Sequence, residues 1–405
     1  MTDVTAGVTL ADIEAARSVL QGVTIQTPIE ESRWLSALAG GPVLLKCENL
    51  QRTGSFKARG AYLRISRLTP EERSRGVVAA SAGNHAQGVA LAASLLGIRS
   101  TVFMPEGAPI PKEKATRAYG ADVVFEGRFL EDSLRAARAF EAETGAVLIH
   151  PFDHVDIVAG QGTCGIEVVE QVPDLRTVLV PTGGGGLLAG MAIAIKSLRP
   201  DVRVVGVQAA GAAAYPASLA QGHPVALTTM KTMADGIAVG LPGEVTFAAV
   251  RDYVDDIITV SEESMSRALL ALVERAKMIV EPAGGAAVAA MLDHPTAFET
   301  PAVAVLSGGN IDPLLLGKVI RHGMAAAGRY LNLRVNIPDT PGGLARLLGE
   351  VGDAGANVLE VMHERISPAL HLDEVEVHLQ LETRGEPHAE RVLTRLRACG
   401  YRVFE

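Results

Sequence analysis

At 405 residues, the chain is long enough to form two or three domains around a large apolar core. Apolar residues make up 48% of the sequence and charged residues 20%, a balance that fits a compact enzyme and excludes a disordered chain. The net charge of −9, with no basic cluster to offset it, argues against nucleic acid and anionic membranes as partners.

The N-terminus and the cysteines indicate a soluble, cytoplasmic protein. The first residues lack the basic start and apolar stretch of a signal peptide, and no apolar run reaches membrane-spanning length. Three cysteines, Cys47, Cys164 and Cys399, lie far apart and form no Cys-x-x-Cys pair. We expect them to be small buried apolar side chains in a reducing compartment, without disulfide or metal roles.

Short β-type runs alternate with helical runs over most of the chain. The expected strands are Val43–Cys47, Gly76–Ala80, Ser100–Met104, Asp122–Phe125, Val147–His150, Thr177–Val180, Val202–Gln208, Asp256–Val260 and Pro301–Leu306. The expected helices include Gly83–Leu96, Pro111–Ala118, Phe129–Thr144, Leu187–Leu198 and Ser261–Arg275. This alternation is typical of βαβ units and predicts a doubly wound α/β body with a parallel sheet.

The pattern changes after Arg329. The expected order is strand Tyr330–Pro338, helix Thr340–Ala354, strand Asn357–Ile366, strand Glu374–Leu381, helix Pro387–Cys399 and strand Tyr401–Phe404. This βαββαβ order predicts a separate α+β domain of the ferredoxin-like type. Its twelve acidic and eight basic residues argue against the RNA-binding use of that fold.

Lys57 and a run of four glycines, Gly183–Gly186, together indicate a cofactor site. Lys57 opens a helical run directly after a Gly-Ser turn, so its amine is placed to face a cleft. The glycines lie between an expected strand and an expected helix, where bare N–H groups and the helix N-terminus bind anions such as phosphate. An amine nucleophile and a phosphate cradle are what pyridoxal 5′-phosphate requires.

The same glycine loop also fits a dinucleotide site, since Gly184, Gly186 and Ala189 satisfy that fingerprint. A dinucleotide site calls for an acidic residue at the end of the next strand, where it would hold a ribose hydroxyl. That strand ends in Gln208, and Asp201 comes before it begins. The pattern therefore favours a phosphate cradle over an NAD site.

Two further loops follow expected strands, and we expect all three loops to converge on one cleft because ligands bind at the carboxyl ends of parallel strands. The loop Ser81–His85 is either a serine cap ahead of a helix or a second anion site for a substrate carboxylate. The loop Ser307–Asn310 is either an ordinary turn or a hydroxyl facing the cofactor's pyridine nitrogen. A serine there makes a weaker electron sink than a carboxylate, which suits β-elimination better than transamination.

Four ordered motifs now identify a family resemblance. They are Ser55–Ala61, Ser81–Gly88, Gly183–Gly190 and Ser307–Asp312. In this order and at these separations they resemble the pyridoxal-phosphate-dependent threonine dehydratases, or threonine ammonia-lyases, of the tryptophan synthase β-like fold. The C-terminal part resembles an ACT domain.

The resemblance implies a fold-type II enzyme with two open twisted parallel-sheet subdomains. The large subdomain comprises residues 1–50 and 150–329, the small one comprises 51–149, and the regulatory ACT domain comprises 330–405. The activity implied is the conversion of L-threonine to 2-oxobutanoate and ammonia, with L-serine to pyruvate as a side reaction. A dimer or tetramer is expected.

The resemblance also implies a role for each matching residue. Lys57 would form the Schiff base with the cofactor and later remove the substrate's α-proton. The other cofactor-binding residues would be Phe56 beside the ring, Asn84 at the ring's 3-oxygen, Gly183, Gly184, Gly185, Gly186 and Leu187 at the phosphate, Glu281 near the ring and Ser307 at the ring nitrogen. The substrate carboxylate would be lined by Ser81, Ala82, Gly83 and His85.

At two places the sequence differs from related enzymes, and the properties tied to those places are not expected here. Ala82 stands where serine racemases carry a second-face serine base, so appreciable racemisation is not expected. Gln208 and Ala214 stand where some relatives carry acidic metal ligands, so no divalent metal is expected, although a monovalent ion held by carbonyls stays open.

In the ACT-like part, an amino-acid effector, with isoleucine as the first candidate, would bind at the turn before the first helix, which leaves N–H groups free for a carboxylate. The effector residues implied are Asp339, Pro341, Gly342, Gly343, Leu344 and Asn357. A plain dimerisation module is the alternative for this domain. For the whole chain, the alternatives are a serine or hydroxyaspartate dehydratase and a non-catalytic amino-acid sensor, against which the intact Lys57, Asn84 and Ser307 argue.

Overall fold

The structure is a computed structural model that describes residues 7–365, 371 and 373–404. It divides into two compact units, residues 1–316 and 317–405. The division point lies within helix α14 (Pro313–Ala326), whereas the sequence pattern changes at Arg329. Helix α14 belongs neither to the alternating strands and helices of the first unit nor to the βαββαβ order of the second. The sequence therefore does not mark a domain boundary inside this helix.

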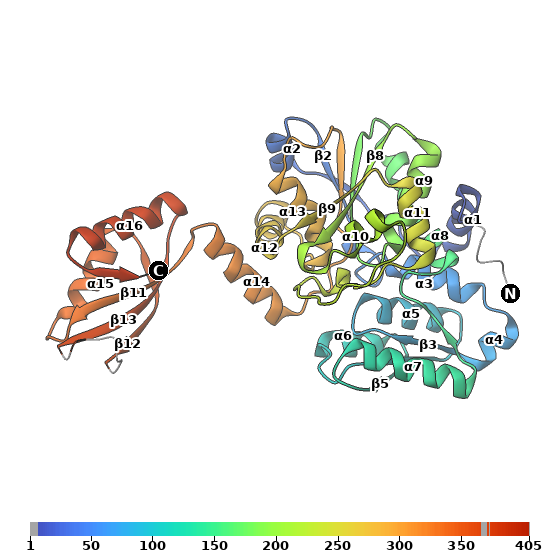
Figure 1. The fold of residues 1–405 in the computed structure, drawn as a ribbon, viewed down its shortest axis with the longest axis horizontal. Coiled ribbons are helices and arrows are strands. Elements are labelled where there is room, and N and C mark those ends of the chain that lie inside the picture. The colour runs from blue at the N-terminus through green and yellow to red at the C-terminus, as the bar shows by residue number, and fades with distance from the viewer. Residues whose placement is uncertain (1–6, 366–370, 372, 405) are drawn as a thin grey trace. The chain divides into compact units, whose positions relative to one another are not determined.

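The larger sheet of the first unit contains the strand that leads into the glycine loop. Among the described residues its order is β1-β2-β10-β7-β8-β9 (Figure 1). Its strands are β1 (Ile29–Glu31), β2 (Val43–Lys46), β7 (Thr177–Pro181), β8 (Arg203–Ala209), β9 (Asp256–Val260) and β10 (Ala302–Val305). All neighbours pair in parallel except the short edge strand β1, which is antiparallel to β2.

The smaller sheet of the first unit is wholly parallel, in the order β5-β4-β3-β6 over the described residues. Its strands are β3 (Val77–Ala80), β4 (Ser100–Met104), β5 (Asp122–Phe125) and β6 (Val147–Leu148). The two sheets place the carboxyl ends of β3, β7 and β10 so that the loops after them line one cavity.

Helices pack on both sheets. Helix α9 lies against β7 and β8, α13 lies against the larger sheet, and α5 and α7 lie against the smaller one. The helices are α1 (Leu10–Leu20), α2 (Arg33–Ala39), α3 (Lys57–Ser66), α4 (Pro70–Arg75), α5 (Asn84–Leu95), α6 (Ile110–Ala118), α7 (Leu130–Thr144), α8 (Val155–Gln171), α9 (Gly186–Leu198), α10 (Ala214–Gln221), α11 (Glu244–Tyr253), α12 (Glu262–Ala271) and α13 (Ala286–Asp293). The main core lies between α8, α9 and the strands β7 and β8, whose apolar residues are almost wholly buried.

The second unit has the expected ferredoxin-like architecture. Its elements are β11 (Tyr330–Pro338), α15 (Gly343–Asp353), β12 (Asn357–Glu364), β13 (Glu374–Glu382), α16 (Glu386–Ala398) and β14 (Arg402–Phe404). The strands form an antiparallel sheet in the order β12-β13-β11-β14. Alternate residues of β11 and β13 are buried beneath the two helices, which gives this unit a core of its own.

The α/β body and the ferredoxin-like unit confirm the predicted fold class. Several details differ from the sequence prediction. The edge strand Ile29–Glu31 was not expected, because a three-residue strand carries too little alternation to detect. The strand expected to reach His150 ends at Leu148, and the helix expected to reach Arg275 changes at Leu272 into a π-helical turn. Ile366, the expected end of a strand, lies outside the described residues.

The cysteine expectation is partly wrong. All three thiols are free, and Cys47 and Cys164 are buried, but Cys399 is exposed. Cys399 follows the end of α16, where its thiol contacts Glu350 at the surface.

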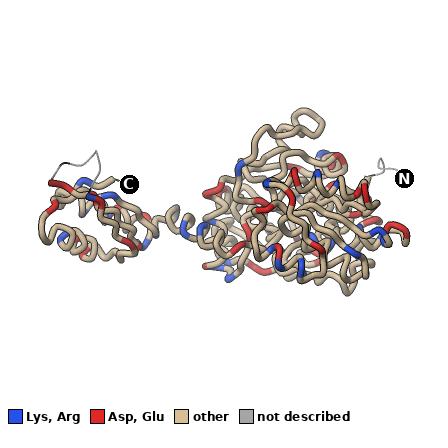
Figure 2. The backbone as a smooth tube through the Cα atoms, turned by 90° about the horizontal axis from the view of Figure 1, so that it is seen from below, with Lys and Arg blue, Asp and Glu red and all other residues tan. Residues whose placement is uncertain are grey.

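Figure 2 shows Lys and Arg interspersed with Asp and Glu along both units. None of the helices in the described part of the chain combines the length and apolar character needed to cross a bilayer.

Candidate active site

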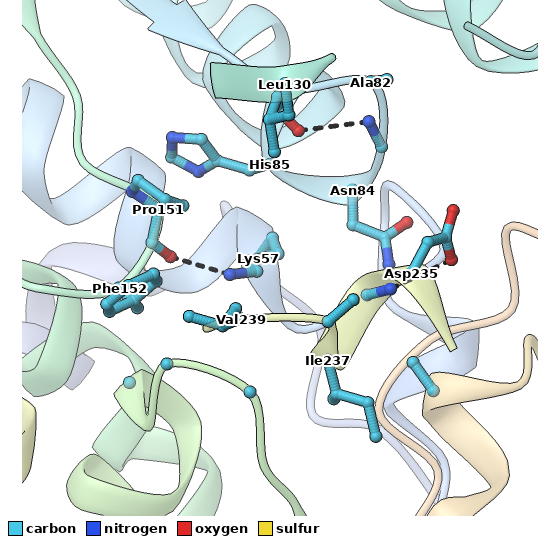
Figure 3. A pocket seen from close by; sticks show the side chains of 18 of the residues that line it. Lys57, Ala82, Asn84, His85, Leu130, Pro151, Phe152, Asp235, Ile237 and Val239 are labelled. Atoms are coloured by element: carbon cyan, nitrogen blue, oxygen red, sulfur yellow. Dashed lines mark hydrogen bonds between the residues drawn. The ribbon is translucent and has the colours of Figure 1, made fainter. Parts of the chain in front are cut away.

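A cavity of about 450 Å³ in the first unit brings together every residue that the sequence predicts for cofactor and substrate binding. Figure 3 shows the amine of Lys57 directed at Pro151, with Asn84, Ile237 and Val239 around the same space. The predicted residues on its walls are Phe56, Lys57, Ser81, Ala82, Gly83, Asn84, His85, Gly183, Gly184, Gly185, Gly186, Leu187, Glu281 and Ser307.

Lys57 is the first residue of α3, and its side chain points into the cavity. The preceding Gly54 has φ +70°, a left-handed turn conformation that orients the start of the helix. The amine donates a hydrogen bond to the Pro151 carbonyl at 2.7 Å. Burial lowers the pKa of Lys57 to about 8, against the opposing effect of the Glu281 charge. The uncharged, nucleophilic fraction of the amine near neutral pH is therefore far larger than for an ordinary lysine, although most of the amine is still protonated at pH 7.

The glycine loop is a tightly enclosed backbone cradle at the N-terminus of α9. A Cβ on Gly184 would lie 2.5 Å from the Phe152 ring, and one on Gly185 would lie 1.9 Å from the Tyr215 hydroxyl. Gly185 also has φ +93°, which side chains rarely adopt. A side chain at Gly184 or Gly185 would therefore clash, and the N–H groups of the loop precede a thirteen-residue helix, which is the arrangement that binds a phosphate.

The loop before α5 presents a second helix N-terminus to the cavity. The N-cap residue is Gly83, which has no side chain to cap the helix. Ser81 is not the cap that one reading of the sequence suggested, because its hydroxyl accepts from the Gly83 N–H at 3.1 Å. The His85 ring donates from Nε2 to the Ile149 carbonyl at 2.7 Å, and burial lowers the pKa of His85 to about 3. His85 is therefore neutral and fixes the loop without adding charge.

A hydrogen-bond chain crosses the cavity wall beside Lys57. Asn84 donates from Nδ2 to Glu281 Oε1 at 2.5 Å and accepts from Asn310 Nδ2 at 2.8 Å. Burial raises the pKa of Glu281 to about 7, with the charge of Lys112 acting against that rise and the charge of Asp235 adding to it. Asn84 retains a second amide hydrogen that can reach a ligand in the cavity. Ser307, only 4% exposed, lines the same space after β10.

Behind Lys57, a closed network of buried charges fixes α3 to the rest of the unit. Arg59 donates to Glu48 on one side and to Glu167 of α8 on the other, at 2.7 Å and 2.6 Å. Lys46 completes the network with a 2.6 Å contact to Glu167. Burial alone would raise the pKa of Glu48, but the Arg59 guanidinium beside it holds that pKa below its usual value. Two cations and two carboxylates therefore balance one another.

The sequence did not identify several residues of the cavity wall. Pro151, which accepts from Lys57, follows a strand that ends earlier than expected. Asp235 and Ile237 belong to a segment without helical or strand periodicity. Lys112 lies inside an ordinary amphipathic helix, and its 2.9 Å ion pair with Asp235 joins positions far apart in the chain. Only the Asp235-Gly236 dipeptide, a turn signal, marks this loop in the sequence.

These residues fit pyridoxal phosphate. Lys57 offers an amine with a lowered pKa, Gly183–Gly186 line the cavity at a helix N-terminus where Gly184 and Gly185 have no room for a side chain, and Phe56 lies against the cavity. The dinucleotide alternative lacks its acidic residue, since Gln208 at the end of β8 is buried and accepts from the Tyr215 N–H. The donor set therefore fits an aldehyde cofactor with one phosphate.

In the second unit, five of the six predicted effector residues lie at the turn into α15. Asn357 does not: it pairs with Glu382 at one end of β13, whereas the turn follows Pro338, which pairs with Glu374 at the other end. Gly342 is the N-cap of that helix with φ +82°, and Gly343 is its first residue. Asp339 accepts from Arg365 at 3.2 Å. The others are Pro341, which is exposed, Leu344, which packs partly against the core, and Asn357, which begins β12.

Residues 20–308 match the family model described as pyridoxal-phosphate dependent enzyme. The chain is 45% identical over 396 residues to an L-threonine ammonia-lyase of Thermotoga maritima, with 98% of this chain and 99% of the relative covered. It is 46% identical over 392 residues to an L-threonine ammonia-lyase of Geobacter sulfurreducens, with 96% and 98% covered.

Two solved structures share the fold of this chain over about three quarters of its length. The threonine deaminase of T.th. matches with a TM-score of 0.72 and 44% identity, over 75% of this chain and 99% of that one. A maize serine racemase matches with a TM-score of 0.74 and 35% identity, over 77% and 97% of the two chains.

Proposed function

The chain belongs to the pyridoxal-phosphate-dependent enzymes and groups with the threonine ammonia-lyases, and we propose that it converts L-threonine into 2-oxobutanoate and ammonia. L-serine, which lacks one methyl group, would give pyruvate as a side reaction. The observation that supports this most strongly is the meeting of Lys57, the glycine cradle, Asn84 and Ser307 in one cavity.

When bound, pyridoxal phosphate supplies an electron sink for the negative charge that develops at the substrate's α-carbon. The chain's own residues position the reactants. The N–H groups of Gly183–Gly186, at the start of α9, would hold the phosphate, and those at the start of α5 would hold the substrate carboxylate. Lys57, whose pKa is lowered to about 8, then takes the α-proton.

Ser307 favours elimination over competing reactions. It is buried at the carboxyl end of β10, and we assign its hydroxyl to the pyridine nitrogen. A hydroxyl would not stabilise a protonated ring nitrogen as a carboxylate would, so a serine at this place would weaken the cofactor as an electron sink and favour loss of the β-hydroxyl over transamination. Ala82 offers no proton-transferring group, which supports loss of water over racemisation.

Steady-state rates with the cofactor-loaded enzyme test the substrate assignment. We expect kcat/KM to be higher for L-threonine than for L-serine, and higher for either than for 3-hydroxyaspartate. One methyl group in an apolar pocket changes this ratio by about 10–200-fold. A preference for serine or hydroxyaspartate would instead identify a dehydratase for that substrate.

The second unit supports a regulatory role, and we place the enzyme in the cytoplasm as a dimer or tetramer. The turn at Gly342 leaves the first N–H groups of α15 without a side-chain cap. An effector carboxylate would bind there, with its ammonium near Asp339. Binding alters catalysis only if the effector prefers one domain arrangement.

Isothermal titration of the full chain with isoleucine is expected to give saturable heat, and isoleucine is expected to lower the rate with threonine. Asp339→Asn removes the negative charge that would pair with the effector ammonium and leaves a neutral amide oxygen, so the isoleucine Kd should rise by about tenfold, which corresponds to about 1.4 kcal/mol of lost binding free energy. Asp353→Asn, which changes another surface carboxylate of this unit, is the matched control. No heat with isoleucine or valine would leave the unit as a dimerisation module.

A further inference from the structure

Lys112 is a buried cation that the proposed chemistry does not use. It lies on α6, its residue is 7% exposed, and its ammonium lines the cavity. The ammonium donates to Asp235 Oδ2 at 2.9 Å, and within residues 7–365 Asp235 is its one hydrogen-bond partner. A buried ammonium requires a counter-charge. Asp235, on the loop across the cavity, supplies it.

The ammonium lies beside the loop that we assign to the substrate carboxylate. A Cβ on Gly83 would lie 3.8 Å from Lys112 Nζ, and no closer atom surrounds that position. A second carboxylate on a substrate's β-carbon would therefore lie within reach of Lys112. Asp235, which also lines the cavity, is already paired with that ammonium.

Within the described lining of the cavity, no unpaired cation is available to such a carboxylate. Among the described residues that line the cavity, Lys57 and Lys112 are the only lysines or arginines, and Lys57 is committed to the cofactor. His85 and His150 are uncharged, since burial lowers their pKa values to about 3 and about 4. Glu281 and Asp235 would both oppose an additional negative charge.

We propose that Asp235 is a specificity-determining residue: by pairing with Lys112 it makes the cavity select hydroxy-amino acids with one carboxylate and reject those with a second carboxylate on the β-carbon. The inference rests on the proposed dehydration and refines its substrate class. Discrimination arises from an unpaired, desolvated charge in the rejected complex. Removal of Asp235 converts Lys112 into a free carboxylate-binding group.

The test compares kcat/KM for 3-hydroxyaspartate and L-threonine in the cofactor-loaded full chain. Asp235→Asn keeps the shape of the side chain and removes its charge, and the ratio of hydroxyaspartate to threonine should rise at least tenfold. The gain should vanish in the double variant Lys112→Met with Asp235→Asn, because it depends on the freed ammonium. Asp252→Asn, which removes a carboxylate paired with Arg251 on the surface, should leave the ratio at the wild-type value.

A direct binding measurement accompanies the kinetics. L-Aspartate has the second carboxylate but no β-hydroxyl to lose, and its Kd should fall at least tenfold in Asp235→Asn. An unchanged ratio and an unchanged aspartate Kd would overturn the inference, as would a gain that persists without Lys112. If the wild-type enzyme has no activity on threonine, the proposed function itself fails, which is a separate result.

Discussion

Lys57→Ala is expected to abolish ammonia release from threonine. The variant loses the amine that binds the cofactor and the base that takes the α-proton, and proton transfer by a positioned base alone contributes about 10²–10⁴-fold. The visible absorbance of the lysine-linked cofactor should also disappear. Cofactor is still expected to bind without a covalent bond, since Gly183–Gly186 and the N-terminus of α9 are unchanged.

The matched control is Lys114→Ala. Lys114 lies exposed on α6, so the same side chain is lost without a change in the cavity. It should retain wild-type turnover and absorbance. Normal turnover in Lys57→Ala would refute the assignment of Lys57, whatever the behaviour of the control.

Arg59→Met is expected to destabilise the first unit severely. The substitution keeps an unbranched side chain but leaves the carboxylates of Glu48 and Glu167 buried with only Lys46 to balance them. Breaking a buried ion pair by removing one partner costs about 3–5 kcal/mol. Denaturant unfolding of the cofactor-free protein, followed by a signal from the first unit, should show a correspondingly lower midpoint.

Arg17→Met provides the comparison. Arg17 also pairs with a glutamate of α8, Glu170, at 2.5 Å, but its side chain is 47% exposed. A solvent-exposed pair contributes about 0–1 kcal/mol, so this variant should unfold close to wild type. Equal unfolding midpoints for the two variants would show that the buried network does not stabilise α3.

Much of the fold follows from local pattern in the sequence. The strands β4, β5, β9 and β11 span the same residues as the β-type runs that predict them. These runs are bounded by turns that leave little freedom at their ends. Strand β6 is shorter than predicted because the chain turns at His150 and Pro151 to meet the Lys57 amine, and that tertiary contact has no signature in local sequence.

The residues of the candidate site also fall into those that local sequence predicts and those that it does not. The glycine loop and the Ser81–His85 loop carry short motifs whose chemistry is readable, and both line the cavity. The pair of Lys112 and Asp235 could not be predicted, because each residue has an ordinary local context. Their significance depends on the burial of Lys112 and on its meeting Asp235 across the cavity, which only the fold determines.

The most direct test of the proposed function is product analysis after cofactor-loaded enzyme is incubated with L-threonine. We expect 2-oxobutanoate and ammonia to form in equal amounts that match the threonine consumed, and we expect neither product with Lys57→Ala. Consumption of threonine to glycine and acetaldehyde, or to its D-isomer, would contradict the account, as would no consumption by the loaded enzyme.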